Sequence, residues 1–378
     1  MLIEVHMLKN YPATNLNRDE TGSPKTCLFG GYTRGRISSQ CLKRNWRKSE
    51  QFCQAIGEEN LGIRTRKFPQ LVCEALAEKG VSEDVLKEVQ PKLSGFGNKE
   101  GKENKDGSTT AQIMFFAPQD IESVAVKIKE ILDDCADIKA VKKLKAKDLQ
   151  AAVKDANVRP VTLDIALFGR MVTSNAFRDV EASMQVAHAV STNKVALESD
   201  YFTAMDDLLS GDTMEESGSA MIGDTDYNSS CYYIYASIDT DALKENLKYA
   251  DNAEKLIQKA IPALLRAMAM TNPSGKQNSF AGHTLPSAMM VEVKQNKIPV
   301  NLVNAFVKPV RPTIGTDLVQ NSIQRLADET DTVVNDFGLA VDKRLWFCSS
   351  KYGVKPKCEA ELCKNFQALL EQVTELLK

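Results

Sequence analysis

The chain has 378 residues, 43% of them hydrophobic and 26% charged, with a formal net charge of −2. This balance is typical of a globular protein, and the length suits one core that carries a large insertion. No run of about 18 apolar residues is present, which argues against a membrane partner, and the N-terminus lacks the long apolar region of a signal peptide. The nine cysteines contain no CxxC pair, which argues against a disulfide framework. The sequence therefore predicts a cytoplasmic protein.

Basic and acidic residues are segregated along the chain. Segment 30–48 has no acidic residue, and its basic residues are Arg34, Arg36, Lys43, Arg44, Arg47 and Lys48. A second basic run at 139–147 holds five lysines, whereas acidic residues gather at 206–216 and in the C-terminal third. A nearly neutral chain with a confined basic stripe is typical of a protein with a limited nucleic-acid surface.

The first part of the chain predicts a strand, a loop and a series of helices. Residues 2–8 alternate as a strand does, and residues 9–37 predict a long loop rich in Asn, Asp, Gly, Pro and Thr. Ser38 and Ser39 offer an N-cap for a helix over 39–56. Helical spacing recurs in four further segments, interrupted by a Gly- and Lys-rich loop at 95–110. These segments are 68–79, 82–90, 110–135 and 141–155.

The second part predicts strands between helices. In chain order we expect a strand at 161–171, a helix at 178–190, a hairpin at 194–230, a strand at 231–240, a helix at 251–270 and a strand at 287–294. The tail has helical spacing at 316–336 and 359–377, with a short strand LWFCSS between them. This order predicts an α+β fold of the βαββαβ type, ferredoxin-like or RNA-recognition-like, with additions at two points.

The basic helix is the most informative element. Lys43 and Arg47 are four residues apart, as are Arg44 and Lys48, so both pairs lie on one broad face. The backbone N–H groups of the first turn form a second site for an anion, because a helix N-terminus carries partial positive charge. Such a helix suits a sugar-phosphate backbone. The alternative is a solvated surface helix.

Several separated motifs resemble the CasC family, the Cascade backbone subunit of type I-E CRISPR systems. The opening segment contains LNRD, FGG and RISSQCLKR in the family's order. Three later segments match in sequence order: DIALFGRMVTSNAF with MQVAHAVSTNKV, DYFTAMDDL with YYIYASI, and NPSGKQNSFAGHTLPSAMMVEV. The resemblance spans about residues 1–310, whereas the helical block and the tail match poorly.

The resemblance implies a hand-like fold and a set of RNA-binding residues. The palm would comprise 1–57, 166–193 and 231–378, the helical fingers 58–165, and the thumb hairpin 194–230. Copies would stack along guide RNA, presenting it for pairing with target DNA beside other Cascade subunits, without catalysis or a cofactor. The implied RNA-binding residues are Asn17, Arg18, Lys25, Arg36, Ser38, Ser39, Gln40, Lys43, Arg44, Met171, Lys276 and Gln277, and the basic helix adds Arg47.

Some of these residues also have structural interpretations. Met171 is either core filling or a flexible wedge beside displaced bases. Tyr233 and Tyr235 resemble stacking platforms, but we expect them in core or interface packing. The lysines at 139–147 lie either on a solvated helix face or on a non-specific DNA contact.

Catalytic and metal sites find little support in the sequence. The three histidines are scattered, and GFGNKEGK lacks the spacing of a phosphate-binding loop. One enzymatic alternative is a metal-dependent cut of target RNA by Asp19, as in related type III backbone subunits. The structural alternative is that Asp19 orients Arg18 or Lys25 through a salt bridge. A ribosomal or messenger-RNA-binding protein would explain the basic helix but leave the later motifs unexplained.

Overall fold

The computed structural model describes residues 1–155, 161–204 and 221–378, and the chain divides into two compact units. The first unit consists of Met1–Phe52, Val186–Ser237 and Leu264–Lys378, and the second of Cys53–Gln185 and Ile238–Ala263. Four elements cross the boundaries between the units: α2 (Glu50–Ile56), β6 (Met184–Val186), β9 (Met221–Asp239) and α10 (Ala253–Met270). Among the described residues, no helix has the length and apolar character needed to cross a membrane.

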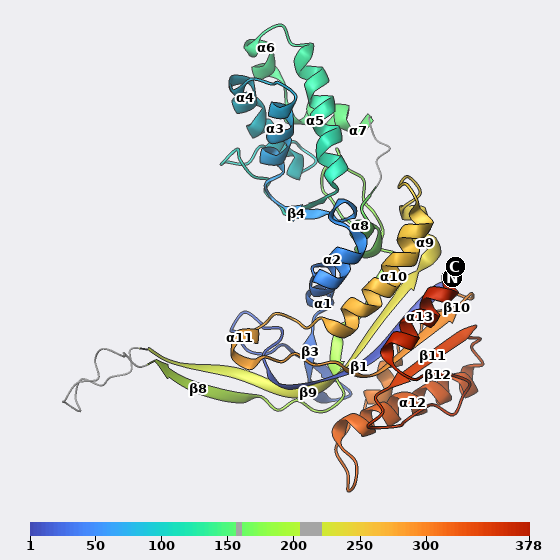
Figure 1. The fold of residues 1–378 in the computed structure, drawn as a ribbon. Coiled ribbons are helices and arrows are strands. Elements are labelled where there is room, and N and C mark those ends of the chain that lie inside the picture. Colours follow the sequence, from blue (N-terminus) through green and yellow to red (C-terminus); the bar gives the residue numbers. More distant parts are fainter. Residues whose placement is uncertain (156–160, 205–220) are drawn as a thin grey trace, which may run out of the picture. The chain divides into compact units, whose positions relative to one another are not determined.

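A large sheet organises the first unit (Figure 1). Its strand order is β12-β11-β10-β1-β9-β7-β3-β2. The strands are β1 (Leu2–Thr14), β2 (Thr26–Phe29), β3 (Tyr32–Ile37), β7 (Ala189–Ser191), β10 (Pro286–Lys294), β11 (Lys343–Cys348) and β12 (Glu361–Cys363). The pairs β1–β10, β10–β11, β7–β9, β3–β7 and β2–β3 are antiparallel, whereas β11–β12 is parallel.

The helices of the first unit complete the predicted element order. They are α1 (Ser39–Arg47), α11 (Gln277–Phe280), the 3₁₀ helix η3 (Leu302–Phe306), α12 (Leu318–Phe337) and α13 (Phe366–Leu376). Along the chain β1, α1, β7, β9, α10 and β10 follow one another as β, α, β, β, α and β. The α+β class predicted from the sequence is confirmed.

One face of this sheet is covered by η3 and α12. Their apolar side chains pack with Tyr233 and Tyr235 of β9, which are 2% and 6% exposed. RNA-recognition domains stack bases on aromatic residues of an open sheet face. In this chain the two tyrosines belong to the core, as the sequence predicted.

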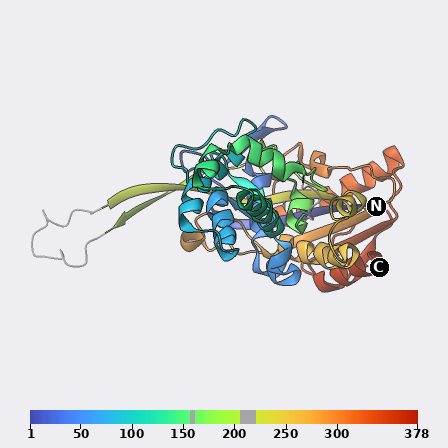
Figure 2. The ribbon, with the colours of Figure 1, turned by 90° about the horizontal axis from the view of Figure 1, so that it is seen from above.

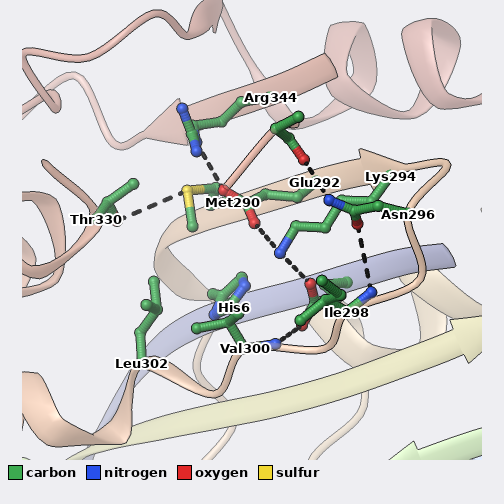
Figure 3. A network of polar contacts seen from close by, with 12 residues as sticks. His6, Met290, Glu292, Lys294, Asn296, Ile298, Val300, Leu302, Thr330 and Arg344 are labelled. Carbon is green, nitrogen blue, oxygen red and sulfur yellow. Dashed lines mark hydrogen bonds and ion pairs between the residues drawn. The ribbon is translucent and has the colours of Figure 1, made fainter. Parts of the chain in front are cut away.

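Buried charges cross the sheet and fix its register (Figure 3). Glu292 of β10 pairs in register with Glu4 of β1 and with Arg344 of β11. Arg344 Nε lies 2.7 Å from Glu292 Oε1, and Lys294 forms ion pairs with both Glu292 and Glu4. A shift of one residue would move these side chains to the other face and leave buried charges unpaired, a cost of several kcal/mol.

The second unit is mainly helical. Its elements are η1 (Glu58–Asn60), β4 (Ile63–Thr65), α3 (Phe68–Glu78), α4 (Glu83–Ser94), η2 (Gly95–Gly97), β5 (Met114–Phe116), α5 (Pro118–Asp133), α6 (Ile138–Lys143), α7 (Ala146–Asp155), α8 (Leu163–Phe168) and α9 (Thr240–Asn246). Its core includes the rings of Phe68, Phe96, Phe116 and Phe177, and β4 pairs with β5. The helices predicted at 68–79, 82–90 and 141–155 are confirmed in large part, whereas 110–135 contains strand β5 ahead of helix α5.

Four predictions of local structure are wrong. Segment 9–37 contains the end of β1 and the β2–β3 hairpin, which turns at Gly30 and Gly31, both with positive φ. The helix at 39–56 breaks at Ser49, whose hydroxyl donates to Trp46 O at 2.8 Å and accepts from Phe52 N at 3.3 Å. Segment 161–171 contains helix α8 instead of a strand, and 178–190 contains β6 and β7 instead of a helix.

The predicted hairpin at 194–230 is confirmed in its described part. Strand β8 (Glu198–Ala204) pairs antiparallel with the first residues of β9, from Glu198↔Tyr227 to Ala204↔Met221. The two strands project from the sheet of the first unit (Figure 1, Figure 2). Residues 205–220 of the predicted hairpin lie outside the described residues.

Candidate nucleic-acid interface

Helix α1 is anchored at its N-terminus by the loop that follows β1. Ser38 is the N-cap, and its Oγ accepts a hydrogen bond from Cys41 N at 3.3 Å. The backbone N–H of Ser38 donates to Asn17 Oδ1 at 2.8 Å. Leu42 and Trp46 are buried beneath the helix. The cap is therefore held by one of the predicted RNA-binding residues, Asn17.

Backbone hydrogen bonds tie three predicted site segments together. Lys25 N donates to Asn17 O at 2.8 Å, and Arg36 N donates to Lys25 O at 2.8 Å. Segments that are separate in the sequence thus lie side by side at the start of α1.

Four cations gather beside His188 and Cys41, and we call Lys25, Arg36, Lys43 and Arg44 the cationic cluster. Arg36 Nη1 lies 3.0 Å from Nδ1 of the exposed His188. Desolvation lowers the pKa of His188, and Arg36, Lys25 and Lys43 lower it further. Burial raises the pKa of the Cys41 thiol, and Arg44 and Lys25 act against that shift. Each of the four cations thus lies near enough to His188 or Cys41 to act on its pKa.

Two other arginines of the basic stripe are buried. Arg34 is fully buried and donates from both Nη atoms, at 2.7–3.1 Å, to the carbonyl oxygens of Ser191, Thr192, Phe306 and Val307. It joins β3 to β7 and η3. Arg47, a predicted RNA-binding residue, is only 7% exposed. Of the predicted RNA-binding residues beside the cap, Ser39 is buried and Gln40 is exposed.

The loop with Lys276 and Gln277 packs against the end of β1. A Cβ at Gly275 would lie 2.5 Å from Asn15 O and 2.4 Å from Leu16 O, so only glycine permits this approach. Lys276 has a φ of 49°, and Gln277 Nε2 donates to Pro273 O at 2.7 Å. Lys276 and Gln277 are thereby brought beside the segment that leads into Asn17.

Asp19 caps a turn. Its Oδ1 accepts from Thr21 N at 2.9 Å, Thr21 Oγ1 at 2.7 Å and Ser23 N at 3.1 Å. The hydroxyl of Thr21 is the main cause of the lowered pKa of this carboxyl group. These contacts differ from the predicted salt bridge to Arg18 or Lys25. Arg18 itself is exposed.

Nearly the whole chain matches one known protein family. A family model described as CT1975-like protein matches residues 3–374. The chain belongs to the CT1975-like protein family. This membership confirms the resemblance to CasC proteins found in the sequence.

Solved structures share the fold of this CT1975-like chain. One chain of a "CRISPR RNA-guided surveillance complex, pre-nicking" is similar with a TM-score of 0.80 and 24% identity, over 100% of both chains. A chain of a "CRISPR RNA-guided surveillance complex" has a TM-score of 0.60 and 21% identity, again over 100% of both chains. A comparison with curated protein sequences gives no match.

Met171 belongs to the second unit of the CT1975-like chain. It is 90% exposed, which excludes the core-filling interpretation for this chain by itself. The adjacent Arg170 is buried and forms an ion pair with Asp120, with 2.6 Å between Nη1 and Oδ2. Arg170 also exchanges backbone hydrogen bonds with Val180. An anchored loop therefore presents a flexible apolar side chain to solvent.

Sequence reasoning did not single out His188. The three histidines of the chain are far apart in the sequence, and no spacing pattern marks this one. Within the described ranges, no group of three or more His, Cys, Asp or Glu side chains is placed to hold a metal ion. His188 becomes notable only when the fold sets it against Arg36.

Proposed function

We propose that the protein is a non-catalytic subunit of a type I-E CRISPR surveillance complex that binds guide RNA along its sugar-phosphate backbone. The observation that carries this proposal is the cationic cluster beside the capped N-terminus of α1. Its members come from the segment before β2, from β3 and from α1. A phosphate chain relieves the repulsion among these cations and accepts hydrogen bonds from them.

The other predicted residues extend this surface. Asn17, Arg18, Ser38, Ser39 and Gln40 surround the helix start, and Lys276 and Gln277 follow beside Asn15 and Leu16. Arg47 belongs to the same proposed RNA-binding set, and it is the least exposed member of the helix's basic residues, at 7%. Contacts of this kind hold a backbone without reading its bases, which suits a guide whose sequence varies.

Larger-scale roles follow from the same proposal. Copies of the chain polymerise along the guide with other Cascade subunits, and the guide pairs with target DNA in antiviral defence. The palm, fingers and thumb take the predicted boundaries, with the β8–β9 hairpin as the thumb and Met171 as the wedge beside displaced bases. The five lysines at 139–147 are exposed on and around α6 and α7, which suits a non-specific DNA contact.

A non-catalytic role is supported by the environment of Asp19. Its Oδ1 already accepts three hydrogen bonds within its own turn, from Thr21 and Ser23. These hydrogen bonds give Asp19 a structural role in its turn, which is the alternative to metal binding.

Salt-dependent RNA binding tests the proposal. Lys43→Ala with Arg44→Ala should weaken binding equally for guides of different spacer sequence. The slope of log affinity against log salt should fall by roughly 0.7 for each phosphate of a single strand that the variant no longer neutralises. The matched control is Lys355→Ala with Lys364→Ala, because these exposed cations flank β12 at the opposite edge of the sheet. Equal slopes in both double variants, or effects that depend on spacer sequence, would contradict backbone binding.

A further inference from the structure

His188 forms a hydrogen bond with Arg36 through its Nδ1 atom. The histidine lies in the connection between β6 and β7, and its Nδ1 is 3.0 Å from Arg36 Nη1. A guanidinium has only donors, so Nδ1 accepts and carries no proton. The neutral ring therefore bears its proton on Nε2, which remains a donor.

Among the residues that the structure describes, the charged groups that shift the pKa of His188 are cations. They are Lys25 from the segment before β2, Arg36 from β3 and Lys43 from α1. Together with desolvation they hold the pKa of His188 below its ordinary value, so the ring is neutral near pH 7. The nearby thiols of Cys27 and Cys41 stay protonated in this range because burial raises the pKa of each. Lysine and arginine ordinarily titrate above about pH 10.

We propose that His188 is a further RNA-contacting residue, and that it takes up a proton when a phosphate binds in the cationic cluster. This inference rests on the proposed function. The phosphate brings negative charge to a place where cations now oppose protonation, and Nε2–H can donate to a phosphate oxygen. A proton from solvent on Nδ1 ends the hydrogen bond from Arg36, and that guanidinium then becomes available to the same phosphate.

Proton uptake makes RNA binding depend on pH. Each His188 that is neutral in the free chain and protonated in the complex takes up as much as one proton on binding. RNA affinity therefore rises as pH falls through the range between the pKa of His188 in the complex and its pKa in the free chain. The largest effect at one site is about tenfold for each pH unit inside that window. The guide should bind roughly tenfold more tightly near pH 6 than near pH 8 at constant ionic strength.

The test measures binding of a repeat–spacer guide RNA to the full-length chain at these two pH values. His188→Asn keeps an acceptor for Arg36 but cannot take up a proton, so its affinity should lose the pH dependence. His283→Asn is the matched control, because His283 is exposed and is not among the groups around the cationic cluster. It should keep the wild-type pH dependence.

Other outcomes contradict the inference in distinguishable ways. RNA binding with the same pH dependence in wild type and His188→Asn would overturn the role of His188 alone. Failure of the wild type to bind the guide at either pH would overturn the proposed function as well. NMR titration of the histidines in the wild-type chain provides a readout that needs no variant. The pKa of His188 should rise when guide RNA is added, and an unchanged pKa would refute proton uptake.

Discussion

Arg34 and Arg36 stand two residues apart on β3 and have different surroundings. Arg34 is fully buried and donates to four carbonyl oxygens, whereas Arg36 is half-buried and meets the exposed ring of His188. Both residues belong to one basic stripe in the sequence. Sequence composition located the stripe but could not tell its buried arginine from its half-buried one. The burial of Arg34 depends on η3, which lies more than 260 residues further along the chain.

This difference predicts that substituting Arg34 lowers stability, whereas the same substitution of Arg36 weakens RNA binding. Arg34→Met should lower the free energy of unfolding by about 3 kcal/mol or more, because four buried carbonyl groups lose their donor. Arg36→Met should change stability by less than about 1 kcal/mol but weaken RNA binding. Urea denaturation followed by circular dichroism measures the first effect, and RNA titration measures the second. Equal stability losses in the two variants would contradict these assignments.

At Asp19 the prediction concerns catalysis. Asp19→Ala removes the acceptor for Thr21 and Ser23 and should loosen the turn without changing RNA cleavage, because wild type should cut no RNA. Complementary target RNA incubated with the guide complex and Mg²⁺ or Mn²⁺, then separated on a denaturing gel, provides the measurement. Regular, metal-dependent cuts that disappear in Asp19→Ala would favour the nuclease alternative, since that variant removes a carboxylate ligand.

At the scale of elements, the strongest periodic patterns were predictive and the buried or short ones were not. The spacing at 251–270 and 316–336 located α10 and α12 within two residues at each end. Segment 161–171 misled because Leu163–Leu167 in α8 are all buried, Asp164 included, so no exposed polar face marks the helical period. The β2–β3 hairpin was missed because its strands carry charged and small residues, and its Gly30–Gly31 turn resembled the end of a loop.

The β8–β9 hairpin exposes apolar side chains that its own fold does not use. Tyr201 is 64% exposed and Ile222 is 63% exposed. Tyr201→Ser with Ile222→Ser should therefore leave stability within about 0.5 kcal/mol of wild type. If the hairpin wedges between bases, chemical probing of the bound guide should lose its periodic reactive positions, because stacked bases are protected. An unchanged probing pattern in a folded variant would count against a thumb that displaces bases.

At the scale of the whole molecule, the sequence predicted candidate RNA-binding segments but not how they meet. The motifs around Asn17, Arg36 and Lys276 predicted the site residues, and the fold sets Lys276 beside the segment leading into Asn17 through the close approach of Gly275. In the sequence, the only sign of this close backbone approach is a single glycine, Gly275. Residues 166–185 and 238–263 belong to the predicted palm, and by packing they fall in the second compact unit. That division depends on contacts between distant segments.

The proposed assembly predicts a stoichiometry set by the guide. A subunit that repeats one backbone contact forms a head-to-tail array, and the RNA limits its length through multivalent binding. Guides with longer spacers should therefore recruit additional copies in steps, which native mass spectrometry of reconstituted complexes can count. A constant number of copies across spacer lengths would contradict an array that follows the guide.

The most direct test of the central claim is to sequence the RNA that co-purifies with the protein from its native cells. A subunit that holds guide RNA through its cationic cluster should carry CRISPR repeat–spacer RNA of one length class. That RNA should be depleted in Lys43→Ala with Arg44→Ala and retained in Lys355→Ala with Lys364→Ala. Heterogeneous ribosomal or messenger RNA in the wild-type sample would contradict the account.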